Sequence, residues 1–88
     1  MEDIRSYVAD RDVYSMLTDV RQQLRRLPPD GKIIHKKNSI IGLIEGWRAI
    51  YPTQERGETF TRLSRRDPLL YGAVINKLNE AVSLGVML

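Results

Sequence analysis

Four prolines divide this sequence into segments that are each short enough to form a single helix. Proline lacks a backbone N–H and disfavours the α-helical conformation in the residue before it, so a helix usually ends before a proline. The exception is the first helical turn, which accommodates proline well. We therefore expect Pro28, Pro29 and Pro52 to end helices, and Pro68, which follows Asp67, to begin one.

The segment before Pro28 has the apolar periodicity of a helix. We expect one long helix that begins near Glu2 or Asp10 and ends at Leu27. Its apolar stripe has alternating spacings of four and three residues, which place the side chains on one face. The pattern covers about two heptads, so it favours a helix packed on a core, with a dimer seam as the alternative. The stripe consists of Val13, Leu17, Val20, Leu24 and Leu27.

A second helix is expected between the double proline and Pro52. Residues Lys32–Lys37 fit either a brief strand or the loop that leads into this helix, and Asn38 or Ser39 could cap it. A polar linker over Thr53–Gly57 would follow the helix. The apolar positions with helical spacing are Ile40, Ile41, Ile44, Trp47, Ile50 and Tyr51.

The second helix also contains two glycines. Gly42 and Gly46 each weaken a helix by about 1 kcal/mol relative to alanine. Because they are four residues apart, they would form a smooth groove on one face of the helix. We interpret this groove as a site of close packing against another helix.

The rest of the chain is predicted to form two helices. A short helix would cover Glu58–Arg66. Asp67 suits the N-cap of the next helix and Pro68 suits its first position. That helix would end near Leu84, and Gly85 suits the C′ position just beyond it. The residues expected to face the core are Phe60, Leu63, Tyr71, Val74, Ile75, Leu78 and Val82.

These elements predict an all-α fold. We expect a compact bundle of about four helices in a single small domain over residues 1–88: one long N-terminal helix, two shorter ones and a C-terminal helix. Trp47 and Phe60 are most simply core residues. The order of short helix, sharp turn and longer helix in the C-terminal half is also compatible with a helix-turn-helix.

The charge of the chain is concentrated in one segment. Residues Arg21–Lys37 hold six basic residues and one acid, Asp30, so they carry +5, whereas the whole chain carries +3. The segment includes the double proline, which places the charge at a corner between two helices. A basic corner suits a polyanionic partner. The six basic residues are Arg21, Arg25, Arg26, Lys32, Lys36 and Lys37.

From this corner we predict a small nucleic-acid-binding regulatory protein that contacts phosphates of DNA or RNA. Arg62, Arg65 and Arg66 form a second basic cluster that could assist. The alternative is a protein–protein interaction module, such as an adaptor, inhibitor or oligomerisation domain. If Asp19, Glu45 or Glu55 lies among the basic side chains, the arrangement favours the protein–protein interaction module.

Catalytic and cofactor chemistry find little support in the sequence. The chain has no cysteine, which excludes disulfides, thiolate zinc sites and cysteine nucleophiles. His35 is the only histidine and has no acid near it in sequence to orient it, so we interpret it as a solvent-facing or contact residue. Glu55 and Glu58 could share a helix face, but a solvated acidic face is the simpler interpretation. We therefore expect no enzymatic activity, no metal site and no cofactor.

The apolar stripes carry more hydrophobic surface than an 88-residue domain easily buries. This surplus favours a homodimer. We expect its interface to use Leu17, Val20, Leu24, Leu84, Val86 and Leu88.

Neither a secretion signal nor a membrane span is visible. The first residues have mixed charge and no apolar run, and no apolar stretch approaches 18 residues. The lack of cysteine fits a reducing compartment. We expect an intracellular protein, cytoplasmic or nuclear, that is not secreted and has no membrane partner.

Overall fold

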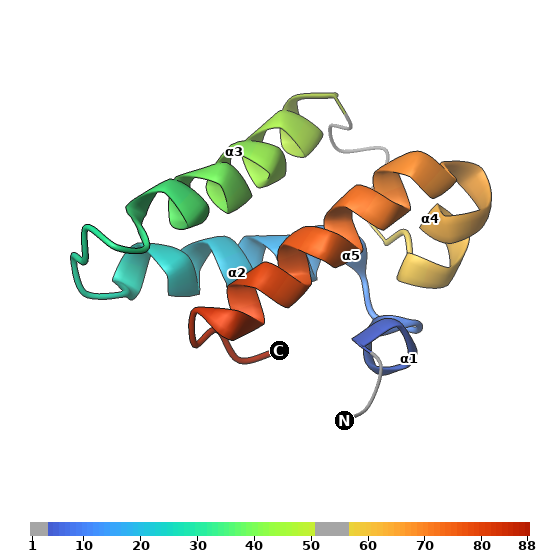
Figure 1. Ribbon diagram of the computed structural model, residues 1–88. Coiled ribbons are helices and arrows are strands. Elements are labelled where there is room, and N and C mark those ends of the chain that lie inside the picture. The colour runs from blue at the N-terminus through green and yellow to red at the C-terminus, as the bar shows by residue number, and fades with distance from the viewer. Residues whose placement is uncertain (1–3, 51–56) are drawn as a thin grey trace.

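The computed structural model describes residues 4–50 and 57–88 (Figure 1). These residues form five helices and no strand, which confirms the predicted all-α bundle. None of the helices within these ranges has the length and apolar character needed to cross a membrane. The helices are α1 (Ile4–Val8), α2 (Val13–Arg26), α3 (Ile34–Ile50), α4 (Phe60–Arg66) and α5 (Pro68–Ser83).

Of the two predicted starts of the long N-terminal helix, Glu2 is wrong as the start of one continuous helix, because the chain breaks into α1 and α2. The alternative start at Asp10 lies three residues before the observed start of α2 at Val13. Asp12 has an extended backbone and caps α2, its carboxylate accepting a hydrogen bond from the Ser15 N–H at 2.7 Å. The linker between the two helices pairs instead with residues 58–61: the Thr61 N–H donates to the Ala9 carbonyl at 3.1 Å, and the Val13 N–H donates to the Glu58 carbonyl at 2.8 Å. A continuous helix would have used these backbone groups internally.

The start of α3 also differs from the prediction. Lys32 and Ile33 form part of the turn that leads into the helix, but residues 34–37 are already helical, so neither Asn38 nor Ser39 is the cap. A turn at Asp30 starts the helix: its carboxylate accepts from the Lys32 N–H and its carbonyl accepts from the Ile33 N–H. The predictions for Glu2, Tyr51, Pro52, Glu55 and most of the Thr53–Gly57 linker lie outside the described residues.

The C-terminal helices agree with the sequence. Asp67 ends α4 and also caps α5, accepting from the Leu70 N–H at 3.1 Å, and Pro68 begins α5. Gly85 has a φ of 106°, and the Val86 N–H donates to the Ala81 carbonyl at 3.1 Å, so α5 ends in a Schellman motif. Because Asp67 alone separates α4 from α5, the connection is not the three- to four-residue turn of a helix-turn-helix.

The buried residues form one core to which all five helices contribute. Trp47 and Phe60 lie within it, as predicted. Val82 is exposed, and Ala81 takes its expected place in the core. The packing role predicted for Gly42 and Gly46 is wrong, because a Cβ atom at either position would meet nothing within 4 Å.

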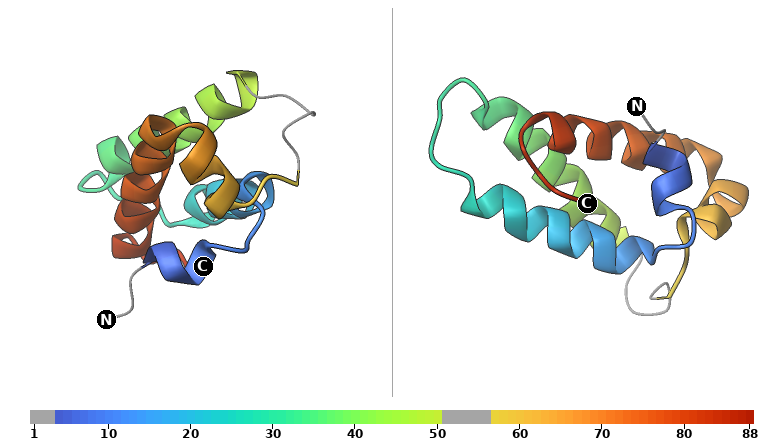
Figure 2. Two further views of the ribbon diagram at one scale, coloured as in Figure 1. Left: turned by 90° about the vertical axis from the view of Figure 1, so that its right-hand side faces the viewer. Right: turned by 90° about the horizontal axis from the view of Figure 1, so that it is seen from below.

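The helices place the two basic clusters far apart. The corner between α2 and α3 lies at one end of the molecule and α4 lies at the other end, in two perpendicular views (Figures 1 and 2). Between them, α5 contacts each of the other helices. The molecule measures 36 × 32 × 19 Å, so its two ends are separate surfaces.

Candidate nucleic-acid interface

The basic corner is built from the end of α2, the turn, and the start of α3. Arg25 and Arg26 stand in the last turn of α2, where positive charge is favourable because the helix dipole is negative there. Lys32 follows in the turn, and Lys36 lies in the first turn of α3. The fold thus brings residues from either side of the double proline to one end of the bundle (Figure 2).

Three cations of the corner are exposed and have no ion-pair partner among the described residues: Arg26, Lys32 and Lys36. Lys37 and Arg21 are half-buried. The Nε atom of Arg21 is buried, without a hydrogen-bond partner in the part of the chain that is described. The exposed cations are therefore the groups that a phosphate could reach directly.

One acid does lie among the basic residues. The Arg25 guanidinium donates to the Glu45 carboxylate on α3 at 2.9 Å, and both side chains are about half exposed. A surface pair of this kind contributes roughly 0.2–1 kcal/mol. Asp19 lies elsewhere on α2 and accepts from Gln23 at 2.8 Å. Of the two candidate acids that the structure describes, Asp19 and Glu45, only Glu45 lies among the basic residues of the corner.

The start of α3 concentrates positive charge in an unusual way. Its first turn contains His35, Lys36 and Lys37 and no acid. The N-terminus of a helix carries about half a positive charge, so each cation there is unfavourable by roughly 0.3–1 kcal/mol. His35 is exposed, as predicted. Glu45 and Asp30 neutralise the corner only in part, because neither lies within the first turn of α3.

The second cluster is only partly available. Arg62 and Arg65 are exposed, without an ion pair in the described ranges. Arg66 donates to both carboxylate oxygens of Glu58, at 2.7 and 2.8 Å, and Glu58 is only 7% exposed. Arg66 therefore holds the fold together. No local sequence signal predicts this pair, because Glu58 lies in the loop before α4.

Most of the residues expected at a dimer interface are inside the chain. Leu17, Val20, Leu24 and Val86 are buried in the core, which removes them from any contact between two folded copies. Leu84 and Leu88 are half-buried and pack against that core. The stripe on α2 is therefore a core stripe, the first of the two interpretations that its spacing allowed.

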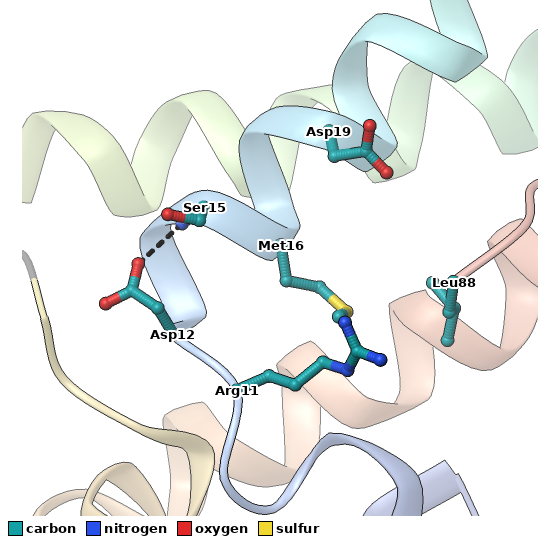
Figure 3. Close-up of a pocket in the computed structure, with 6 residues that line it drawn as sticks. All are labelled: Arg11, Asp12, Ser15, Met16, Asp19 and Leu88. Atoms are coloured by element: carbon teal, nitrogen blue, oxygen red, sulfur yellow. Dashed lines mark hydrogen bonds between the residues drawn. The ribbon is translucent and has the colours of Figure 1, made fainter.

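A small cavity of about 330 Å³ lies beside the first turns of α2 (Figure 3). Its two carboxylates take part in local hydrogen bonds: Asp12 Oδ2 caps α2, and Asp19 accepts from Gln23. The other oxygen of Asp12, Oδ1, is buried without a hydrogen-bond partner among the described residues. Within the described residues, no group of three or more histidine, aspartate or glutamate side chains could hold a metal ion. The lining residues are Arg11, Asp12, Ser15, Met16, Asp19 and Leu88.

A larger apolar groove of about 890 Å³ lies where α1, the C-terminal end of α5 and the following tail meet. Its most exposed side chains are Met87, Val82 and Tyr7. This groove could not be predicted from the sequence, because it depends on α1 docking beside α5. Searches with this chain found no matching protein family, no matching curated protein and no matching solved structure.

Proposed function

We propose that this chain is a small regulatory protein that binds the phosphate backbone of nucleic acid through the basic corner and acts by binding, without catalysis. The contact residues are Arg26, Lys32 and Lys36, with Arg21 and Lys37 beside them. Such a protein would work in a compartment that holds nucleic acid, the cytoplasm or the nucleus. Phosphate contacts position a protein on nucleic acid without reading its sequence.

The observation that carries this proposal is the first turn of α3. Its lysines are placed against the positive end of the helix dipole, and the first turn itself holds no acid; Asp30 lies in the preceding turn, where its carboxylate accepts from the Lys32 N–H. Sequences usually avoid such an arrangement, and positions where a local rule is broken tend to be functional. A phosphate group would turn the same arrangement into a favourable one, because both the lysines and the helix end attract it.

Salt dependence of binding tests the proposal. About four phosphate contacts give a slope of roughly −3.6 in log K against log salt, so the Kd should rise about 100-fold between 50 and 200 mM. The measurement is a fluorescence titration with labelled duplex and single-stranded DNA and RNA. Absence of binding at about 50 mM salt by folded protein would contradict the proposal.

Two double variants that remove the same charge locate the site. Lys32→Ala/Lys36→Ala should weaken binding to every nucleic-acid sequence. It should also reduce the magnitude of the salt slope by about 1.8, which corresponds to two phosphate contacts. Arg62→Ala/Arg65→Ala removes equal charge at the far end of the molecule and should change the slope much less. Equal losses from the two variants would show that net charge, and not the corner, governs binding.

A protein partner is the second candidate, and the Arg25–Glu45 pair favours it. A surface that carries an acid among its cations is better matched by a polypeptide with both charges than by a phosphate chain. The same titration separates the candidates. If nucleic acid does not bind at low salt, the corner becomes a surface for an acidic or mixed-charge polypeptide.

A further inference from the structure

The start of α3 presents one exposed face to solvent. Ser39 follows Lys36 by three residues and His35 by four, so these three side chains lie on the same side of the helix. Lys32, in the turn before the helix, precedes His35 and Lys36 at the same two spacings. All four side chains are exposed, and together they form the His35 face.

Contacts with the neighbouring helices orient this face. The Ser39 hydroxyl accepts a hydrogen bond from the Lys77 ammonium group of α5 at 3.0 Å. Glu45, further along α3, instead accepts from the Arg25 guanidinium of α2 at 2.9 Å. The His35 face therefore lies on the α5 side of α3, whereas the acid that interleaves with the corner lies on the α2 side.

Cations outnumber acids around the His35 face. Each of the three acids nearby already takes part in a hydrogen bond or ion pair: one in the turn, one with α2 and one within α5. The surroundings of the imidazole are therefore those of a surface that attracts anions. The charged groups are Asp30 and Lys32 of the turn, Lys36, Lys37 and Glu45 of α3, Arg21, Arg25 and Arg26 of α2, and Lys77 and Glu80 of α5.

His35 itself is available for contact with a ligand. Its side chain is exposed, and its ring nitrogens have no hydrogen-bond partner among the residues that the structure describes. It is also the only histidine of the chain. Histidine is the side chain whose charge ordinarily changes between about pH 5 and pH 8. The basic corner thus includes an exposed group whose charge depends on pH near neutrality.

We propose that His35 is a further phosphate contact of the basic corner and that its protonation strengthens nucleic-acid binding at acid pH. This inference rests on the proposed function and adds a residue and a form of regulation to the same site. His35 lies between Lys32 and Lys36 on one face, so a phosphate strand bound by both lysines passes beside the imidazole. The protonated ring donates from both nitrogens and carries a full charge, whereas the neutral ring donates from one. A phosphate therefore favours the protonated form, and the complex takes up a proton.

Binding at two pH values tests the inference. Labelled duplex DNA is titrated with the protein at about pH 5.5 and about pH 7.5, a range in which the histidine charge changes. At about 50 mM salt, the Kd should be about three- to fivefold lower at the acid pH, because one phosphate contact is added. The salt slope should also become steeper, from roughly −3.6 to roughly −4.5.

Two variants of the same residue separate its charge from its presence. His35→Gln is never charged and should bind with the weaker Kd at both pH values, whereas His35→Lys is always charged and should bind with the tighter Kd at both. Circular dichroism should show the same fold in both variants, because the side chain is exposed. A wild-type Kd that does not change with pH, or a change that persists in His35→Gln, would overturn the inference and leave the proposed function standing. Absence of binding at both pH values by folded protein would contradict the two together.

The single histidine also allows a direct measurement. Its imidazole protons give one set of NMR signals that can be followed as a function of pH without assignment of other histidines. Added duplex should move the midpoint of this titration to higher pH, because phosphate favours the protonated ring. A midpoint that stays in place when the duplex is bound would show that the imidazole does not contact phosphate.

Discussion

The same kind of side chain has opposite effects on stability at the two helix ends that form the basic corner. Arg26 stands at the negative end of α2 and Lys36 at the positive end of α3. Arg26 therefore stabilises its helix, whereas Lys36 opposes its own. In the proposed function, both residues contact phosphates of the same nucleic acid.

This contrast predicts opposite changes in stability with the same change in binding. Lys36→Glu should raise the free energy of unfolding by about 0.5–1 kcal/mol, and Arg26→Glu should lower it by a similar amount. Both variants should weaken nucleic-acid binding at about 50 mM salt. Urea unfolding and the fluorescence titration measure the two quantities. If Lys36→Glu lowered the free energy of unfolding, it would contradict the claim that positive charge at the start of α3 destabilises the helix.

At the scale of helices, some helix-end signals in the sequence were informative and others were misleading. Asp67, Pro68 and Gly85 sit where the helix-end rules place them, because those rules depend on local backbone geometry alone. The start of α3 was missed, because Asn38 and Ser39 are favoured cap residues, whereas a turn at Asp30 starts the helix. The break between α1 and α2 was not predicted, because it depends on backbone pairing with residues 45 to 52 positions away. For the same reason the basic residues could be predicted, but not which of them form ion pairs.

The glycines of α3 give a prediction at this scale. Gly42→Ala should raise the free energy of unfolding by about 0.7–1 kcal/mol, because a methyl group there meets open space. Gly85→Ala is the matched control and should destabilise the protein, since its φ of 106° disfavours any side chain. Thermal unfolding followed by circular dichroism distinguishes the two. A loss of stability in Gly42→Ala would mean that this face of α3 is covered.

A partly buried ion pair, between Glu58 in the loop before α4 and Arg66 at the end of that helix, forms a clamp. Arg66→Met should lower the free energy of unfolding by about 2–3 kcal/mol, because it leaves the carboxylate of Glu58 buried and unpaired. The double variant Glu58→Gln/Arg66→Met should recover part of this loss, since no buried charge remains. Urea unfolding of both proteins provides the test. A loss below about 0.5 kcal/mol in Arg66→Met would show that the clamp is dispensable.

The backbone pairing between the α1–α2 linker and residues 58–61 also predicts an order of folding. The α2–α3 hairpin joins neighbouring parts of the chain, so it can assemble while the polypeptide is still being synthesised. α1 cannot reach its place until Thr61, whose N–H and hydroxyl both donate to the Ala9 carbonyl, has left the ribosome. Although α1 precedes the other described helices in the chain, we therefore expect it to dock late, and the apolar groove that it helps to form to be completed only after it has docked.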